Sequence, residues 1–199
     1  MNGWWNRLAI VDLDSKEISF EKIGEDKLHS YLGGRGLGAR LLMDRISEKE
    51  DPLGNNILIF YSGPVTGTPV PTSGRFSLTS KSPLTGTICD SNVGGFFGRE
   101  FKKCGIDVLI IEGNSEEPCI IDIKDDKINI KKTDLWGMTT RKSIDNLKGK
   151  SALIGPAGEN LVKYANIVTD DFRVFGRGGL GAVMGSKYLK GINCKGSKK

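Results

Sequence analysis

The chain has 199 residues, of which 38% are hydrophobic and 27% charged, and its formal net charge is +5. This length is enough to bury a core in one large domain or two small ones. No run of about 18 apolar residues is present and the start does not have the pattern of a signal peptide, so we expect no membrane segment. The positive charge comes mostly from dispersed lysines without interleaved aromatic residues, so we expect no nucleic-acid partner.

The predicted elements are many short strands and a few short helices. Alternating apolar residues between turn signals predict strands, and apolar residues at helical spacing predict helices. In chain order, the predicted strands are 7–13, 17–23, 57–61, 75–79, 87–90, 107–112, 119–123, 127–131, 152–154, 164–168 and 190–194. The predicted helices are 26–32, 37–46, 96–103, 139–147 and 181–188. Antiparallel-looking strands joined by hairpins, with few helices, indicate an α+β fold.

Four glycine-rich blocks stand out because they hold 15 of the 27 glycines, four of the nine arginines, and no Asp, Glu or Lys. Glycine lets backbone N–H groups come close to a ligand, and the forked arginine side chain suits phosphate. One such block is more often a set of tight turns, but the four together indicate a surface for a bulky, multiply anionic ligand. The blocks are GGRGLG (33–38), GPVTGTPVPTSGR (63–75), SNVGGFFG (91–98) and RVFGRGGLGAVMG (173–185).

Three of these blocks contain residues suited to contact such a ligand. Arg75 leaves the proline-rich block at the start of a predicted strand, which is a rigid position. Asn92 offers its side chain or its carbonyl, and residues 94–95 open a predicted helix whose N-terminus attracts anions. Arg173 and Arg177 lie beside the last predicted helix.

Common nucleotide-binding motifs fit the fourth block poorly. Residues 176–181 match GxGxxG, but no buried strand precedes them and no acidic residue follows about 20 positions later. Residues 185–187 have the wrong order for a P-loop. The first and fourth blocks are also similar in sequence, because residues 34–39 resemble residues 177–182. This similarity fits either two halves related by pseudo-symmetry or a chance match of glycine loops.

The cysteines and the histidine give little support for a metal site or a hydrolase. Cys89, Cys104, Cys119 and Cys194 are far apart and form no CxxC pair, which favours reduced thiols and a cytoplasmic protein. The single histidine, His29, is expected at the surface, because a metal site would need more ligands. A Ser-His-Asp arrangement cannot reasonably be proposed around it.

In their order, the motifs resemble the N-terminal domain of the tungsten-containing aldehyde ferredoxin oxidoreductase family. The resemblance covers essentially all of residues 1–199. It implies two β-sheets with a pseudo-two-fold relation and a few short helices, which form the base for a bis-pyranopterin tungsten cofactor (tungstopterin). It runs through an opening Gly-Trp, GGRGLG, GPVTGTPVPTSGR, KSPLTG, NVGGFFG, IIEG, IGPAGENLVKYANIV and GRGGLGAVMGSK followed by LK.

The resemblance also implies which residues hold the cofactor. Arg75 and Arg173 fall at positions that contact the two pterin phosphates. A magnesium ion links these phosphates and takes the backbone carbonyls of Asn92 and Val174. Tungsten takes its sulfurs from the pterins and not from protein side chains. No catalytic residue is expected in this chain, because the acid/base groups belong to later domains. The expected cofactor-binding residues are Arg75, Asn92, Gly94, Gly95, Arg173, Val174, Arg177 and Gly178.

Enzymes of this family oxidise aldehydes to carboxylic acids and pass the electrons through a [4Fe–4S] cluster to ferredoxin. The cluster cysteines and the acid/base groups belong to later, helical domains, and this chain has no CxxxCxxC-like spacing. We therefore expect a cofactor base that is inactive alone and is completed by helical domains or a partner subunit, with a homodimer also compatible.

The alternative functions are a free-standing pterin-cofactor or phosphate-binding module without catalysis, a subunit of a related tungsten enzyme such as an aromatic thioester reductase and, more weakly, a nucleotide-binding domain. The sequence leaves open both the substrate and the choice between tungsten and molybdenum.

Overall fold

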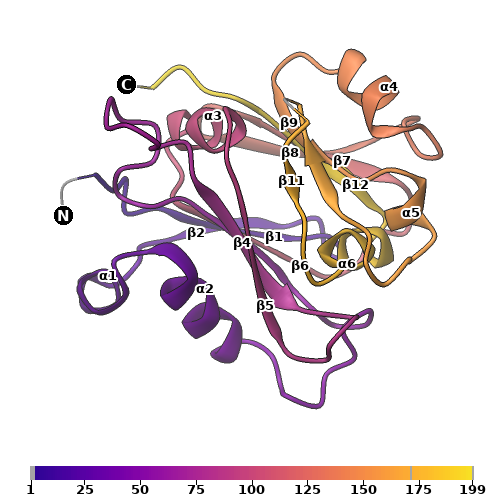
Figure 1. Cartoon of the computed structure of the whole chain (residues 1–199), viewed down its shortest axis with the longest axis horizontal. Coiled ribbons are helices and arrows are strands. Elements are labelled where there is room, and N and C mark those ends of the chain that lie inside the picture. The colour runs from indigo at the N-terminus through magenta and orange to yellow at the C-terminus, as the bar shows by residue number, and fades with distance from the viewer. Residues whose placement is uncertain (1–2, 171, 199) are drawn as a thin grey trace.

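The computed structural model describes residues 3–170 and 172–198 and contains two six-stranded sheets with short helices around them (Figure 1). The first sheet contains β1 (Leu8–Asp12), β2 (Ile18–Glu21), β3 (Leu58–Tyr61), β4 (Phe76–Lys81), β5 (Ile88–Val93) and β6 (Val108–Glu112). The second contains β7 (Cys119–Lys124), β8 (Lys127–Lys132), β9 (Lys150–Leu153), β10 (Ile167–Thr169), β11 (Val174–Phe175) and β12 (Leu189–Lys195). The helices are α1 (Glu25–Tyr31), α2 (Gly34–Met43), α3 (Phe97–Lys103), α4 (Thr140–Asp145), α5 (Pro156–Glu159) and α6 (Leu180–Ser186).

The two sheets have the same topology. Their strand orders are β2-β1-β6-β3-β4-β5 and, read in the same sense, β8-β7-β12-β9-β10-β11. In each sheet the first strand forms a hairpin with the second and pairs in parallel with the last strand of its unit. The remaining pairs are antiparallel. This repetition supports the predicted relation between two halves, and it confirms the α+β class.

The parallel pairs add to the expected antiparallel-looking strands a pairing that was not predicted. Leu8 of β1 lies opposite Val108 of β6, and Leu189 of β12 lies opposite Cys119 of β7. These strands are far apart in the sequence, so no hairpin signal reveals their pairing. The sheets are therefore mixed.

The repeated topology also settles the meaning of the similarity between the first and fourth glycine blocks. In both units a glycine motif lies between the edge strand and the last strand: residues 94–98 precede or open α3, and residues 177–182 precede or open α6. The motif at residues 33–38 instead lies at α2, after the N-terminal hairpin. The similarity between residues 34–39 and 177–182 therefore does not mark equivalent positions.

Several element boundaries differ from the sequence predictions. Helix α2 begins at Gly34 and not at residue 37, because Leu32 and Gly33 have positive φ angles of 48° and 78° and turn the chain directly from α1 into α2. The strand predicted for residues 164–168 is observed as Ile167–Thr169. Helix α5 and strand β11 were not predicted, because four and two residues are too few to show a period.

Two hydrophobic cores cover opposite faces of the first sheet. One core lies between the sheets and includes Phe60, Phe76 and Phe175. The other lies between the first sheet and helices α1 and α2, with Leu37 and Tyr61 among its members. Strands β3 and β6, at the centre of the sheet, are therefore buried on both faces, which explains their continuous apolar sequences.

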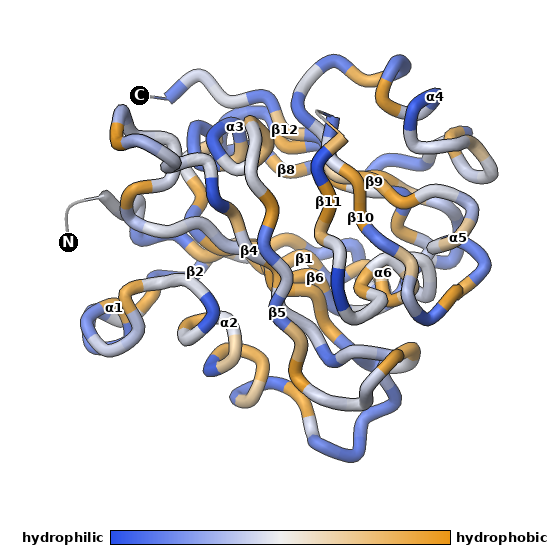
Figure 2. Tube along the Cα trace, viewed as in Figure 1, coloured by the Kyte–Doolittle hydropathy of each residue, from blue (hydrophilic) through white to orange (hydrophobic). Residues whose placement is uncertain are grey.

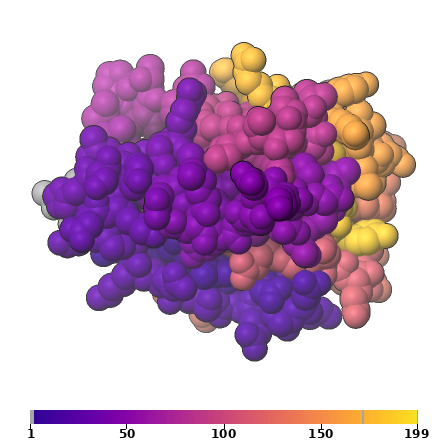
Figure 3. Space-filling model, turned by 90° about the horizontal axis from the view of Figure 1, so that it is seen from below, coloured from indigo at the N-terminus to yellow at the C-terminus, as the bar shows by residue number. Residues whose placement is uncertain are grey.

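The hydropathy of the chain follows this arrangement. Figure 2 shows hydrophobic stretches in the central strands and hydrophilic ones in the outer loops. Seen from below, residues of the N-terminal half make up most of one face, with later residues beside them (Figure 3). None of the helices in the described part of the chain has the length and hydropathy needed to cross a membrane.

Candidate cofactor site

Three of the four glycine blocks meet where the edge strands of the two sheets, β5 and β11, lie against each other. We call these two strands and the loops 94–96 and 176–179 the seam. The hydroxyl of Ser82 donates a hydrogen bond to the carbonyl of Gly178 at 2.7 Å, and a Cβ on Gly178 would overlap the sulfur of Cys89. A Cβ on Gly74 would lie 2.6 Å from the carbonyl oxygen of Gly95. Glycine at these places therefore permits close approach of separate chain segments.

The two residues expected to offer carbonyls to magnesium, Asn92 and Val174, lie on these two neighbouring edge strands. Both residues are exposed, and an edge strand has backbone groups without a partner strand. The side-chain amide of Asn92 is fixed at both ends. Its oxygen accepts from the Ser77 hydroxyl at 2.7 Å, and its nitrogen donates to Asp90 at 2.5 Å.

Arg75 directly precedes β4 and has an exposed side chain on a fixed backbone. The buried hydroxyl of Thr66 donates to the carbonyl of Arg75 at 3.0 Å and accepts from the N–H of Gly63 at 2.8 Å. These bonds tie together the two ends of the proline-rich block. The guanidinium group of Arg75 forms no ion pair with any described residue, so its charge faces outward.

Arg173 and Arg177 are also exposed and make no ion pair within residues 3–170 and 172–198. The backbone of Arg173 is held because its carbonyl accepts from the N–H of Thr169 at 2.7 Å. Arg177 reaches the other side of the seam. Burial and the charge of Asp90 raise the pKa of the Cys89 thiol on β5, whereas the nearby guanidinium of Arg177 opposes that rise.

The expected glycines differ in what they do. Nothing lies within 4 Å of a Cβ built on Gly94, so the space beside it is open. Gly95 and Gly178 have φ angles of 93° and 72°, which favour glycine. In contrast, a Cβ on Gly38 would overlap Thr79 and Tyr61, so this glycine lets α2 pack on the first sheet. Glycine content alone therefore does not identify a ligand surface, because Gly38 of the first block serves packing.

Sequence reasoning missed Asp90 of β5 as part of this site. Its carboxylate accepts hydrogen bonds from the hydroxyls of Tyr61 and Thr79 (3.0 Å to Thr79) and from Asn92, and pairs with Nε of Arg35 at 3.5 Å. Burial, together with Asp90, raises the pKa of the Tyr61 hydroxyl well above its usual range, so Tyr61 stays a donor. The only signal in the sequence is the spacing of two between Asp90 and Asn92, which places both side chains on one face of a strand.

Of the four cysteines and the histidine, only Cys89 lies at the seam. Cys104, Cys119 and Cys194 are buried free thiols, and Cys89 is half-buried. His29 is exposed on α1. Within the described residues, no group of three His, Cys, Asp or Glu side chains could hold a metal ion.

The seam thus fits an anionic cofactor that is held by its organic periphery. Arg75, Arg173 and Arg177 have no carboxylate partners among the described residues, two edge strands meet, and the space beside Gly94 is open. Arginines in this state are available for charge-assisted hydrogen bonds to phosphate. The arrangement is that of two related sheets whose meeting edges offer exposed cations and open backbone to an anionic ligand.

The chain matches the family model described as "Aldehyde ferredoxin oxidoreductase, N-terminal domain" over residues 8–196, and it belongs to this family. It is 47% identical to the tungsten-containing aldehyde ferredoxin oxidoreductase of Thermococcus kodakarensis and 46% identical to that of Pyrococcus furiosus. Each alignment covers 100% of this chain and 34% of the relative, so the chain spans about a third of the length of these relatives.

A solved structure is similar to the whole chain. It is the active site complex BamBC of benzoyl coenzyme A reductase in complex with 1,5-dienoyl-CoA, with a TM-score of 0.93 and 33% sequence identity. The match covers 100% of this chain and 32% of that chain. Sequence and structure comparisons therefore agree on the family and the fold.

Proposed function

We propose that this chain is the tungstopterin-binding base of an aldehyde ferredoxin oxidoreductase. The enzyme oxidises aldehydes to carboxylic acids and passes the electrons through a [4Fe–4S] cluster to ferredoxin. The observation that carries the proposal is the contact between edge strands β5 and β11 in a domain from this family, with Arg75 just before β4, Arg173 just before β11 and Arg177 just after it, each without an ion-pair partner in the described structure. When bound, the tungsten centre supplies the redox chemistry of aldehyde oxidation.

In this proposal the residues of the chain bind and orient the cofactor. Arg75 and Arg173 bind the two pterin phosphates, with Arg177 and Gly178 beside them. A charge-assisted hydrogen bond of this kind contributes about 1.5–3 kcal/mol. The backbone carbonyls of Asn92 and Val174 would bind a magnesium ion beside the phosphates, since Mg²⁺ prefers oxygen ligands.

The glycines complete the site by keeping it accessible. Gly94 and Gly95 allow the pterin to approach the backbone, because neither carries a Cβ. The open space beside Gly94 supports this role.

Other parts of the enzyme supply the rest of the active site. We propose that helical domains, in the same chain or in a partner subunit, cover the cofactor, carry the iron–sulfur cluster and receive ferredoxin. The free thiols agree with a cytoplasmic location. A homodimer is compatible with this arrangement.

Metal and pterin analysis of the anaerobically purified holoenzyme tests the proposal. We expect tungsten or molybdenum, magnesium and a fluorescent pterin released on denaturation. Arg75→Ala should lower the pterin content of the holoenzyme while the thermal midpoint of the cofactor-free protein stays unchanged, because the guanidinium makes no ion pair within the described structure. Arg141→Ala, which changes another exposed arginine on α4, is the matched control. Wild-type protein that contains no pterin and neither tungsten nor molybdenum would contradict the proposal.

A second candidate is a subunit of a related tungsten enzyme that reduces aromatic thioesters. The similarity to the BamBC complex, with its TM-score of 0.93, favours it. Activity of the holoenzyme with aldehydes and a one-electron dye supports the first function. Reduction of an aromatic coenzyme A thioester, with no aldehyde oxidation, supports the second.

A further inference from the structure

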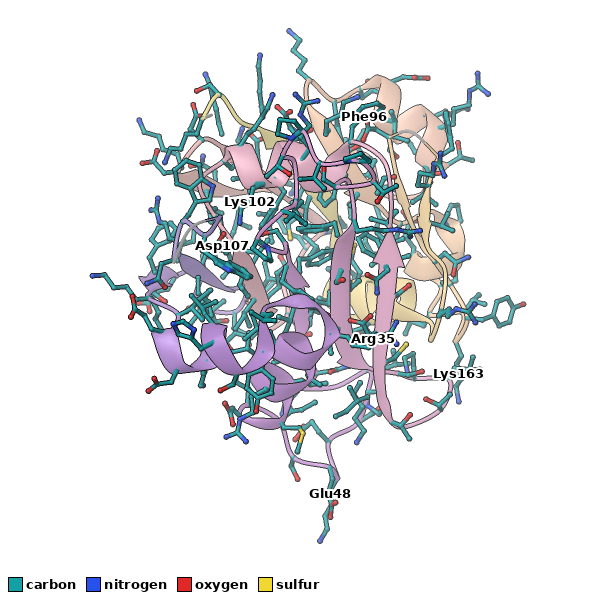
Figure 4. All side chains as sticks on the ribbon, turned by 60° about the vertical axis from the view of Figure 1, so that its left-hand side comes forward. Arg35, Glu48, Phe96, Lys102, Asp107 and Lys163 are labelled. Carbon is teal, nitrogen blue, oxygen red and sulfur yellow. The ribbon has the colours of Figure 1, made fainter. Side chains whose placement is uncertain are left out.

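We infer that Arg35 is an additional phosphate-binding residue of the seam and that Asp90 is the residue that positions it. This inference rests on the proposed function, since it assigns the ligand to the phosphates of the same cofactor. It adds an arginine from the first glycine block, in which Gly33 and Gly38 serve close packing. Figure 4 shows Arg35 at the end of α2 that lies nearest β5.

The geometry leaves the binding end of Arg35 free. Its Nε atom lies 3.5 Å from Oδ1 of Asp90, while its side chain remains 78% exposed. Within the described structure, its two terminal nitrogens form no ion pair. A guanidinium group that is anchored through Nε can still present both terminal nitrogens to one phosphate, which is the forked geometry that arginine offers.

The anchor itself is rigid. The side chain of Asp90 is only 10% exposed, and its carboxylate also accepts from Tyr61, Thr79 and Asn92. Tyr61 lies in the core under α2, with its hydroxyl oxygen 2.9 Å from that of Thr79. Asp90 therefore has little freedom to follow Arg35, and Arg35 must adapt to Asp90.

The direction of this anchor places Arg35 on the face of the sheet that carries two expected site residues. Thr79 lies opposite Asp90, and Ser77 lies opposite Asn92. Arg75 is in phase with Ser77, because side chains on one face recur at every second residue. Oδ1 of Asp90 lies 3.5 Å from Nε of Arg35 and accepts from the amide nitrogen of Asn92 at 2.5 Å, so the guanidinium group lies beside the side chain of Asn92.

The negative charge of Asp90 is compatible with a phosphate bound by Arg35. Arg35 compensates the carboxylate, and three further donors satisfy its oxygens. Arg40, on the same helix, shows the contrasting case. It pairs with Asp44 through a terminal nitrogen at 2.7 Å, so that nitrogen is not available to a phosphate. Arg40 is therefore a matched control for Arg35.

The test compares Arg35→Ala with Arg40→Ala in the holoenzyme and after removal of the cofactor. Pterin and tungsten content are measured first, and then the affinity of the cofactor-free protein for inorganic pyrophosphate is measured by calorimetry. We expect Arg35→Ala to lower pterin content and to weaken pyrophosphate binding roughly tenfold, the effect of losing one charge-assisted contact. Arg40→Ala should match the wild type in both measurements.

Two further variants separate positioning from charge. Arg35→Lys keeps the positive charge, but its single ammonium group cannot contact Asp90 and offer two further nitrogens to a phosphate. Its affinity for pyrophosphate should therefore lie between those of Arg35→Ala and the wild type. Asp90→Asn should weaken pyrophosphate binding although it removes a negative charge, because Arg35 loses its anchor. Far-UV circular dichroism and the thermal midpoint show whether each variant is folded.

The outcomes distinguish this inference from the proposed function. Wild-type holoenzyme without pterin would remove the proposed function and this inference with it. If the wild type holds pterin and Arg35→Ala retains as much of it as Arg40→Ala does, the assignment of Arg35 is wrong and the proposed function stands. Tighter pyrophosphate binding by Asp90→Asn would show that Asp90 only repels the ligand, which contradicts a positioning role.

Discussion

Gly94 is a residue whose surroundings would accept a larger side chain. No atom lies within 4 Å of a Cβ at this position, and its φ is outside the left-handed region. We therefore predict that Gly94→Ala changes the free energy of unfolding of the cofactor-free protein by less than about 0.5 kcal/mol. The variant should nevertheless retain less pterin, because the added methyl group occupies space beside the cofactor.

This prediction needs two measurements on the same preparation: a denaturant titration of the cofactor-free protein and the fluorescence of pterin released from the holoenzyme. Undiminished pterin content in a stable Gly94→Ala variant would show that Gly94 does not line the cofactor. A large loss of stability would show that a fold requirement, and not the ligand, selects glycine here.

Lys187 is a second residue with a measurable consequence. It is fully buried at the end of α6, and its Nζ donates to the carbonyl of Gly113 at 2.8 Å. Burial lowers its pKa from 10.5 to about 8, and the charges of Asp14 and Glu112 only partly oppose this shift. Between these two pH values the unfolded chain binds more protons than the folded chain, so stability rises with pH.

The expected rise from Lys187 between these pH values is about 3 kcal/mol. Lys187→Met has no such proton to lose, so its free energy of unfolding should rise less with pH than that of the wild type. Urea titrations at several pH values across this range measure both proteins. Parallel pH profiles would contradict the lowered pKa.

At the scale of elements, Gly179 determines how α6 begins. It is the N-cap with φ 71°, and a Cβ here would overlap the carbonyl oxygen of Lys163. Gly86 has nearly the same φ, 72°, but open space around it. We predict that Gly86→Ala costs about 1 kcal/mol from backbone strain alone, whereas Gly179→Ala costs about 3 kcal/mol or more.

Chemical denaturation of the two variants measures this difference. Equal losses would show that the chain between Lys163 and α6 moves to accommodate the methyl group. A larger loss for Gly179→Ala would confirm that the close approach of these two segments, and not φ alone, requires glycine at the start of α6.

The elements also show how far the sequence predicts this structure. Alternation and helical spacing located the longer strands and helices, because the order of apolar residues within one segment reflects which face of that segment is buried. The parallel pairing of β1 with β6 depends on contacts between distant segments, which no local pattern records. In the same way, Arg75 and Asn92 could be selected from motifs, whereas Asp90 acquires its role only when Tyr61 and Arg35 are brought to it by the fold.

The whole molecule is held together by a core that both sheets share. Phe175 of the second sheet packs edge-on against Phe60 of the first at 5.9 Å between ring centres, and also contacts Phe76 at 6.4 Å. All three rings are fully or almost fully buried. Because the candidate site lies along the seam, its geometry depends on the same contacts that join the two sheets. The two halves, although they repeat one topology, should therefore unfold together.

We predict that Phe175→Ala lowers the free energy of unfolding by about 3–5 kcal/mol, the usual cost of removing a buried aromatic ring. The nearby Phe172 is 61% exposed, so Phe172→Ala should change stability little and serves as the control. Circular dichroism and tryptophan fluorescence should give coincident single transitions for the wild type and for both variants, because one shared core makes unfolding cooperative. Separate transitions in the wild type would show instead that each sheet is stable alone, and then the seam would be a contact between two independent units.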